Sequence, residues 1–190
     1  MKVLVACEYS GVVRDAFIAR GHDAISCDLL PTESPGPHMI CDIRDTLNLG
    51  WDLMIAHPPC TYLTRAGAKW WPKRQAEQKA AIEFVDLLWS APISKIAIEN
   101  PLGYLSYKTQ TGYIWRRYDD LIQPWMFGET ECKGTCLWLK NLPPLMRTLV
   151  VYERNQTLHN LPPSANRAHI RSRTFQGIAN AMADQWGNLA

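Results

Sequence analysis

The sequence predicts an α/β fold built on a doubly wound, mostly parallel β-sheet. Short and almost wholly apolar runs recur along the chain, as expected of strands that are buried on both faces of a sheet. Between them lie segments whose apolar residues recur at helical intervals. Strands that alternate with helices in this way are typical of parallel sheets covered by helices on both faces.

The first half of the chain supplies three strands and one helix. In order, we expect a strand over 2–7, a helix over 12–20, a strand over 23–29, a loop rich in Pro, Ser and Gly over 31–37, and a strand over 52–56. The helix stops at Gly21, because glycine readily adopts the left-handed conformation that follows many helices. The third strand runs into Pro58-Pro59, which cannot continue a strand ladder.

The second half continues the alternation with a helix over 73–89, a strand over 93–98, a strand over 135–139 and a helix over 174–186. Pro72 suits the first turn of its helix, where no backbone N–H is needed. At 190 residues the chain is long enough for one domain, 1–190, that buries about 70% of its unfolded surface.

The composition is that of a soluble globular protein, with 47% apolar and 20% charged residues. Glu8 interrupts the apolar opening too early for a secretory signal, and no apolar run reaches the roughly 18 residues of a membrane span. We therefore expect an intracellular, cytoplasmic protein with no membrane partner. The sequence does not indicate an oligomeric state.

Six cysteines show no paired framework, so free thiols in a reducing compartment are expected. Cys132 and Cys136 lie four residues apart, but no second Cys/His pair at zinc-finger spacing follows them. We therefore expect no metal site.

The net charge of +2 is too small to indicate a nucleic-acid partner by itself. Two groups of cations stand out, and each is either a solvated face or a contact surface beside a catalytic site. The first group is Arg65, Lys69, Lys73 and Arg74 around Trp70-Trp71, and the second is Arg167, Arg171 and Arg173.

Ligands bind parallel sheets of this kind at the carboxyl ends of the strands. The residues that follow the strand-like runs are Glu8-Tyr9-Ser10-Gly11, Asp28, Asp42, His57-Pro58-Pro59-Cys60 and Glu99-Asn100. Cys60, held behind two prolines, is a candidate nucleophile if its thiolate can form. Taken alone, however, it is interpreted first as a small buried residue of the core and only second as a nucleophile.

The combination of these motifs resembles the cytosine-C5 DNA methyltransferases. Residues 52–64 match the family's strand, Pro-Pro-Cys and following residues without gaps, and Glu99-Asn100-Pro101 is similar to its Glu-Asn-Val motif. Further matches are 5–22 to its first motif, Asp28 to the acid after the second strand, Asp42-Ile43 to its Asp-Ile, and 177–181 to its last motif. The matches follow the family's order over nearly the whole chain, which is closest in size to short, phage-type members.

The chain also departs from the family. Tyr9 and His57 stand where the family has glycines, and Pro101 replaces Val. The Gln-x-Arg-x-Arg motif is not recognisable, and its nearest counterpart, 127–135, keeps Lys133 as a cation. A connection over 140–167 takes the place of the target-recognition domain and is too short to be one.

The resemblance implies a Rossmann-like class I methyltransferase that uses S-adenosylmethionine. Cys60 would add to carbon 6 of cytosine while protonated Glu99, next to Asn100, hydrogen-bonds nitrogen 3, so that carbon 5 can take the methyl group. Such a carboxyl needs a raised pKa, which burial can supply. We also expect Cys60 and Glu99 to line one cleft, on strands whose ends are adjacent.

The resemblance also assigns the cofactor residues. Glu8, Tyr9, Ser10 and Gly11 would approach the methionine part, Asp28 the ribose, and Asp42 with Ile43 the adenine, while Pro58 belongs to the same site and Asn180 would close it. The alternative for Asp28 and Asp42 is the capping of a turn or helix.

DNA is the expected substrate, and its target base must leave the stack to reach Cys60. Thr64, Arg65, Lys69, Trp70, Lys133, Arg171 and Arg173 are the expected DNA contacts. The two tryptophans could equally be core residues. Two alternatives remain: the same chemistry on a free cytosine nucleotide, and a catalytically silent DNA-binding or inhibitory module in which Tyr9 blocks the cofactor. Intact Cys60 and Glu99 argue against the second.

Overall fold

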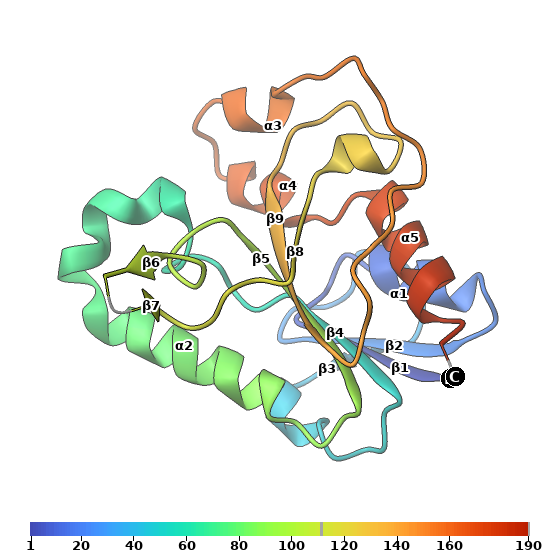
Figure 1. Cartoon of the computed structure of the whole chain (residues 1–190). Helices are drawn as coiled ribbons and strands as arrows, with labels where there is room; N and C mark the ends of the chain where they lie inside the picture. The colour runs from blue at the N-terminus through green and yellow to red at the C-terminus, as the bar shows by residue number, and fades with distance from the viewer. Residues whose placement is uncertain (111, 190) are drawn as a thin grey trace.

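The computed structural model describes residues 1–110 and 112–189, which form one seven-stranded sheet and a small two-stranded one (Figure 1). The strands of the large sheet follow the order β3-β2-β1-β4-β5-β9-β8. Their bounds are β1 Lys2–Ala6, β2 Asp23–Asp28, β3 His38–Ile40, β4 Leu53–Ala56, β5 Lys95–Pro101, β8 Asp120–Ile122 and β9 Thr135–Lys140.

The first five strands of this order are parallel, and β9 runs antiparallel to both of its neighbours, β5 and β8. The chain builds outward from β1 through β2 to β3 and then returns to add β4 and β5 on the other side. The strand order therefore reverses between β1 and β4, which defines a doubly wound, Rossmann-like sheet. The predicted fold class is confirmed.

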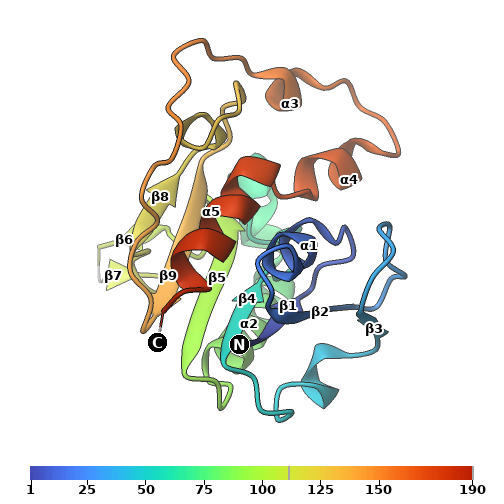
Figure 2. The same ribbon diagram turned by 90° about the vertical axis from the view of Figure 1, so that its right-hand side faces the viewer.

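Helices cover both faces of the sheet (Figure 2). On one face, α1 (Val12–Ile18) and α5 (Gln176–Trp186) pack on Val3 and Val5, and on the other, α2 (Gln75–Trp89) packs against the core that holds Leu4 and Ala6. Alternate residues of one strand thus enter opposite cores. This double burial explains why the strands appear in the sequence as continuous apolar runs.

Each predicted strand and helix is present, but the start of α2 was predicted wrongly. Residues Arg65–Lys73 form a 3-10 helix, η2, which contains Pro72, and α2 begins only at Gln75. The Trp71 ring meets the rings of Tyr104 and Tyr107 edge-on at 4.9 and 5.7 Å between centroids. This packing holds η2 against the loop after β5, which local sequence signals do not encode.

The elements missed by the sequence analysis are all short. They are β3, β8, β6 (Lys108–Thr109), β7 (Gly112–Tyr113), the 3-10 helices η1 (Ile43–Asp45) and η3 (Pro124–Met126), α3 (Thr157–Asn160) and α4 (Arg167–Ser172). Segments of two to six residues carry too few positions to show a periodicity.

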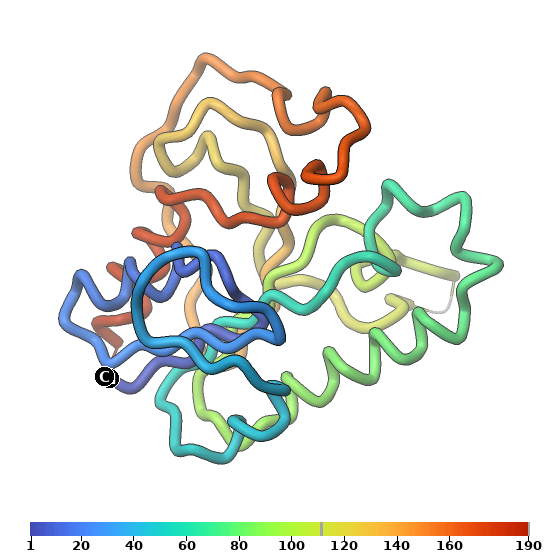
Figure 3. The backbone as a smooth tube through the Cα atoms, turned by 180° about the vertical axis from the view of Figure 1, so that it is seen from behind, coloured from blue at the N-terminus to red at the C-terminus, as the bar shows by residue number. Residues whose placement is uncertain are grey.

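The connection expected over 140–167 does not form a separate module. After β9 the chain returns alongside residues 127–131, with bridges between Phe127 and Leu149 and between Glu131 and Asn155. It then arches through α3 and α4 before entering α5 (Figure 3). No helix in the described ranges is long and apolar enough to cross a membrane.

Candidate active site

The ends of β4 and β5 place two titratable side chains next to each other. Ala56 pairs with Ile98 in the parallel register, so the next residues, His57 and Glu99, lie side by side at the carboxyl edge. His57 Nδ1 lies 3.2 Å from Glu99 Oε2, and the two side chains are 11% and 15% exposed. The expectation that these strand ends are adjacent is confirmed.

The loop that carries Cys60 is fastened to β5 and the residues after it. Asn100, which is 1% exposed, donates from Nδ2 to the Pro58 carbonyl at 2.9 Å, and the Tyr104 N–H donates to the Leu63 carbonyl at 2.6 Å. A side chain at Gly103 would place its Cβ 2.0 Å from the Leu63 oxygen, so only glycine allows this approach. Cys60 therefore sits on a positioned loop.

Cys60 is half-buried and shares an electrostatic environment with Glu99. Burial raises the pKa of the Cys60 thiol and the charge of Glu99 raises it further, while Lys133 and Arg171 lower it by less. The net direction is upward, so the resting group is a thiol at neutral pH. A reactive thiolate would depend on the nearby cations and on what binds beside them.

Glu99 departs from the sequence prediction. Burial raises its pKa, but the hydrogen bond with His57, the charges of Lys133 and His57, and a hydrogen bond with Thr135 together hold the pKa below its usual range. The predicted raised pKa is therefore wrong for the structure as it stands. Polar partners from neighbouring segments stabilise the carboxylate more than burial destabilises it.

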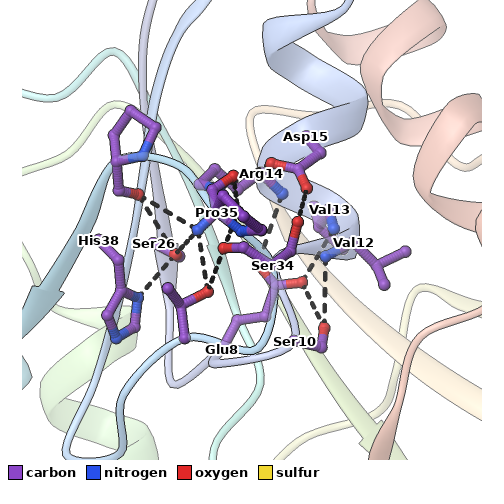
Figure 4. A network of polar contacts seen from close by, with 12 residues as sticks. Glu8, Ser10, Val12, Val13, Arg14, Asp15, Ser26, Ser34, Pro35 and His38 are labelled. Atoms are coloured by element: carbon purple, nitrogen blue, oxygen red, sulfur yellow. Dashed lines mark hydrogen bonds and ion pairs between the residues drawn. The ribbon is translucent and has the colours of Figure 1, made fainter.

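Glu8 at the end of β1 caps the first turn of α1 (Figure 4). Its carboxylate accepts hydrogen bonds from the Val13 N–H at 2.9 Å, the Arg14 N–H at 3.4 Å and the Ser10 hydroxyl at 2.9 Å. These N–H groups have no partner within the helix, and the helix dipole favours an anion there. Glu8 and Ser10 are thus occupied in building the turn, and their cofactor role stays a prediction.

Arg14, which the sequence analysis missed, is a fully buried cation at the same turn (Figure 4). It donates to the Ser26 hydroxyl at 3.2 Å, the Thr32 hydroxyl at 3.1 Å and the Ser34 carbonyl at 3.0 Å, and it pairs with Asp15 at 2.8 Å. A Cβ on Gly11 would come within 2.5 Å of the Arg14 guanidinium. The loop after β2 therefore packs over Gly11.

Asp28 and Asp42 both lie within electrostatic range of Cys7. Burial, and then the charges of Asp28, Cys27 and Asp42, raise the pKa of Cys7 to about 12. Asp28 accepts from the Leu30 N–H at 3.0 Å, and Asp42 accepts from the Arg44 N–H at 3.0 Å at the start of η1. The capping role considered for both acids is present. Ile43 beside them is buried.

A hollow of about 440 Å³ lies between the loop after β4 and α2. It is lined by Pro59, Thr61, Tyr62, Glu77, Ala80, Ala81 and Phe84. Arg44, paired with Asp42 at 2.7 Å, lies over the Phe84 ring at 5.4 Å, which connects Asp42 to the hollow. Its largely apolar lining with two aromatic rings suits a flat ring. The predicted cofactor residues do not line this hollow, and Tyr62 and Phe84 were missed.

Tyr9 is engaged by α4. Its hydroxyl lies 2.9 Å from His169 Nδ1, His169 Nε2 lies 3.0 Å from Glu33, and Arg173 pairs with Glu33 at 3.3 Å. Arg171, on the same helix, is close enough to lower the pKa of Cys60. The helix thus links the loops after β1 and β2 to the Cys60 region.

The two tryptophans after Cys60 have different environments. Trp70 is 44% exposed with the Lys69 ammonium 5.2 Å from its ring, whereas Trp71 packs on Tyr104 and Tyr107. Arg65 is exposed, and Thr64 caps η2 by accepting from the Ala66 N–H at 3.4 Å. Trp71 is thus partly buried against other aromatic rings without belonging to either core, and Trp70 is exposed.

The remaining predicted residues lie to either side of this group. Lys133 donates from Nζ to the Arg173 carbonyl at 3.5 Å and acts electrostatically on both Cys60 and Glu99. Asn180 accepts from Gln176 at 3.1 Å within α5, and its role in closing a cofactor site stays a prediction. Among residues 1–110 and 112–189, no group of three or more His, Cys, Asp or Glu side chains is arranged to hold a metal ion.

Comparison with models of known protein families gives no match, and no curated protein matches the sequence. Among solved structures, the chain is similar to a mutant of DNMT2 from Spodoptera frugiperda, with 15% identity and a TM-score of 0.44. The match covers 82% of this chain and 56% of that one, so the chain spans little more than half the length of this neighbour. A similarity this weak does not assign a function to the chain. The fold class is assigned from the strand order of the sheet.

Proposed function

We propose that this protein transfers a methyl group from S-adenosylmethionine to carbon 5 of cytosine in DNA, with Cys60 as the nucleophile. The observation that carries the proposal is the placement of Cys60 and Glu99 at the ends of neighbouring parallel strands, where Lys133 acts on both. The match of the surrounding motifs to the cytosine-C5 methyltransferases supports the same reaction.

Carbon 5 of cytosine is a poor nucleophile, so the ring has to be activated before it can accept a methyl group. In the proposed reaction the Cys60 sulfur adds to carbon 6, while Glu99 donates a hydrogen bond to nitrogen 3. The loop contacts of Asn100 and Gly103 hold the thiol in a fixed position relative to the carboxyl group. Holding reacting groups in a fixed geometry lowers the entropic part of the activation barrier and so accelerates the reaction.

Lys133 and Arg171 have the charge needed to favour a thiolate at Cys60, since both oppose the effects of burial and of Glu99. An anionic phosphate next to these two cations would weaken their lowering of the Cys60 pKa. We therefore place the phosphate backbone of the substrate toward Lys69 and Arg65, on the exposed side of η2. Trp70, exposed beside Lys69, offers a ring on which a base can stack.

The residues present fit S-adenosylmethionine in two respects. The hollow that Tyr62 and Phe84 help to line suits the adenine ring, and Asp42, which is linked to it through Arg44, can accept a hydrogen bond from an amino group. Asp28, within range of the same Cys7 as Asp42, can accept hydrogen bonds from ribose hydroxyls. When bound, the cofactor supplies an electrophilic methyl group. The α1 N-terminus is already occupied by Glu8, so we place the cofactor's carboxylate elsewhere.

The test is incubation of the protein with tritiated S-adenosylmethionine and either cytosine-containing DNA or free cytosine nucleotides. We expect label on carbon 5 of cytosine in DNA, none with Cys60→Ser, and undiminished transfer with Cys132→Ser, another half-buried thiol. Label on nucleotides alone would replace DNA as the substrate. Label on the exocyclic amine, or in the Cys60→Ser variant, would refute the mechanism.

A further inference from the structure

His57 is the departure from the family pattern that lies closest to the proposed chemistry. Where the resembled family has glycine, this chain places an imidazole with Nδ1 at 3.2 Å from Glu99 Oε2. The ring is largely buried, and its other nitrogen, Nε2, is buried with no hydrogen-bond partner among residues 1–110 and 112–189. The imidazole can therefore exchange a proton with Glu99 directly through Nδ1.

The groups that face this pair are mostly cationic or polar. Lys133, just before β9, and Thr135, its first residue, both favour the charged form of Glu99. The thiols of Cys60 and Cys136 lie within range of the Glu99 charge, and Arg171 of α4 acts on Cys60. In these surroundings Glu99 is a carboxylate.

A carboxylate cannot donate the hydrogen bond that nitrogen 3 of cytosine requires. Burial alone would keep a proton on Glu99, but its polar neighbours reverse that tendency. The proton must therefore come from a group that can hold it near neutral pH and that already touches the carboxylate. His57 already touches the carboxylate through Nδ1, and imidazole is the side chain that most often transfers protons in enzymes.

We propose that His57 is a positioning residue that stores the proton Glu99 must donate to cytosine, an inference that rests on the proposed function. As the ring binds, the Nδ1–H bond of the imidazolium breaks, an Oε2–H bond forms on Glu99, and His57 becomes neutral. Cys60 releases its thiol proton to solvent water, and the resulting thiolate bonds to carbon 6 while Glu99 passes its proton to nitrogen 3. Carbon 5 would then take the methyl group as the bond between that group and the cofactor sulfur breaks. Water takes the carbon-5 proton, the bond between Cys60 and carbon 6 breaks with its electron pair returning to sulfur, and the proton on nitrogen 3 returns through Glu99 to His57.

The test compares a conservative substitution of His57 with one that removes its side chain. His57→Asn keeps a donor near the Nδ1 position, so Glu99 stays a carboxylate, but an amide has no proton to give. His57→Gly removes both the donor and the charge that lower the pKa of Glu99, so burial can again favour its protonated form. At pH 8 we expect methyl transfer by His57→Asn to be at least about tenfold slower than wild type, with His57→Gly in between.

The loss in His57→Asn should shrink as the pH falls, because the solvent then supplies the proton that the amide lacks. A purely structural role predicts the reverse order, with the conservative Asn variant the milder one, and a loss that is equal at every pH. Either of those results would overturn the proposal. If His57→Gly does not fold, the pH dependence of His57→Asn decides alone.

A measurement without turnover separates this inference from the proposed function. Carbon-13 NMR of labelled glutamate carboxyls should give a Glu99 pKa that is low in wild type and in His57→Asn and higher in His57→Gly. An unchanged Glu99 pKa in His57→Gly would show that the pair does not share a proton, and would overturn the inference even in an active enzyme. Absence of methyl transfer in wild type would instead refute the proposed function.

Discussion

Two parts of the carboxyl edge of the sheet treat their buried polar groups in opposite ways. Around β1 and β2, Glu8 and Arg14 are surrounded by hydrogen-bond partners from their own chain (Figure 4). Around β4 and β5, His57 Nε2 and Asn100 Oδ1 are buried, and no described residue forms a hydrogen bond with either atom. Unpaired buried polar atoms are costly, so they mark the β4–β5 side as the part organised around something other than its own stability.

Substitution of Cys60 gives the strongest test of this difference between the two sides. If the β4–β5 side is catalytic, Cys60→Ser should reduce methyl transfer by at least about 10³-fold, because a hydroxyl is almost un-ionised near neutral pH. Thermal unfolding should change little, since the thiol is only half-buried. Activity that survives the substitution would leave Cys60 a structural role alone, as for the buried Cys27 and Cys136.

Substitutions on the β1–β2 side should lower the free energy of unfolding instead of the activity. Arg14→Met keeps the volume of the side chain but leaves the Ser26, Thr32 and Ser34 acceptors without their donor, and we expect it to lower the free energy of unfolding by about 3 kcal/mol. The matched control is Arg20→Met, just after the same helix, which removes an exposed pair with Asp184 and should cost less than about 1 kcal/mol. Urea unfolding of both variants measures the difference, and equal losses would contradict the structural role of Arg14.

The electrostatic coupling on the β4–β5 side can be measured through the reactivity of Cys60. Glu99→Gln removes an anion that raises the pKa of the thiol, so alkylation of Cys60 by iodoacetamide at pH 7.5 should become several-fold faster. Lys133→Met removes a cation that lowers the same pKa and should slow the reaction. Alkylation at an unchanged rate in both variants would show that these charges do not reach Cys60.

The smallest effect concerns acid stability. The pKa of Glu99 in the folded protein lies below its value of about 4.5 in an unfolded chain, so the group stabilises the fold above that pH. This contribution is lost as the pH falls below about 4.5 through the folded-state pKa. Stability measured from pH 6 to pH 3.5 should therefore fall less steeply in Glu99→Gln than in wild type, and an equal slope would contradict the direction of the shift.

The sequence predicted the frame of the site well, because the frame follows from burial. Continuous apolar runs at β4 and β5 required strands inside a parallel sheet, and such strands end on one edge, so Cys60 and Glu99 had to approach each other. The same reasoning could not give the ionisation of Glu99. That depends on His57 and also on Lys133 and Thr135, which lie just before and at the start of β9, more than thirty residues away in the sequence.

The buried Arg14 shows the same limit on the other side of the edge. In the sequence it is one cation within an apolar helix, and its partners lie in a loop whose path over Gly11 is decided by the fold. Likewise, nothing in the sequence distinguishes the adjacent Trp70 and Trp71. They differ in exposure because only Trp71 packs on Tyr104 and Tyr107.

The central claim, that the β4–β5 edge is built to add a thiol to a cytosine ring, is tested most directly by covalent trapping. DNA that contains 5-fluorocytosine would be incubated with the protein and S-adenosylmethionine, and the product digested and analysed by mass spectrometry. Since fluorine cannot leave carbon 5 as a proton does, we predict a stable adduct in which the Cys60 sulfur is bonded to the base. An enzyme that methylates cytosine but forms no such adduct, or forms it at another residue, would contradict the account.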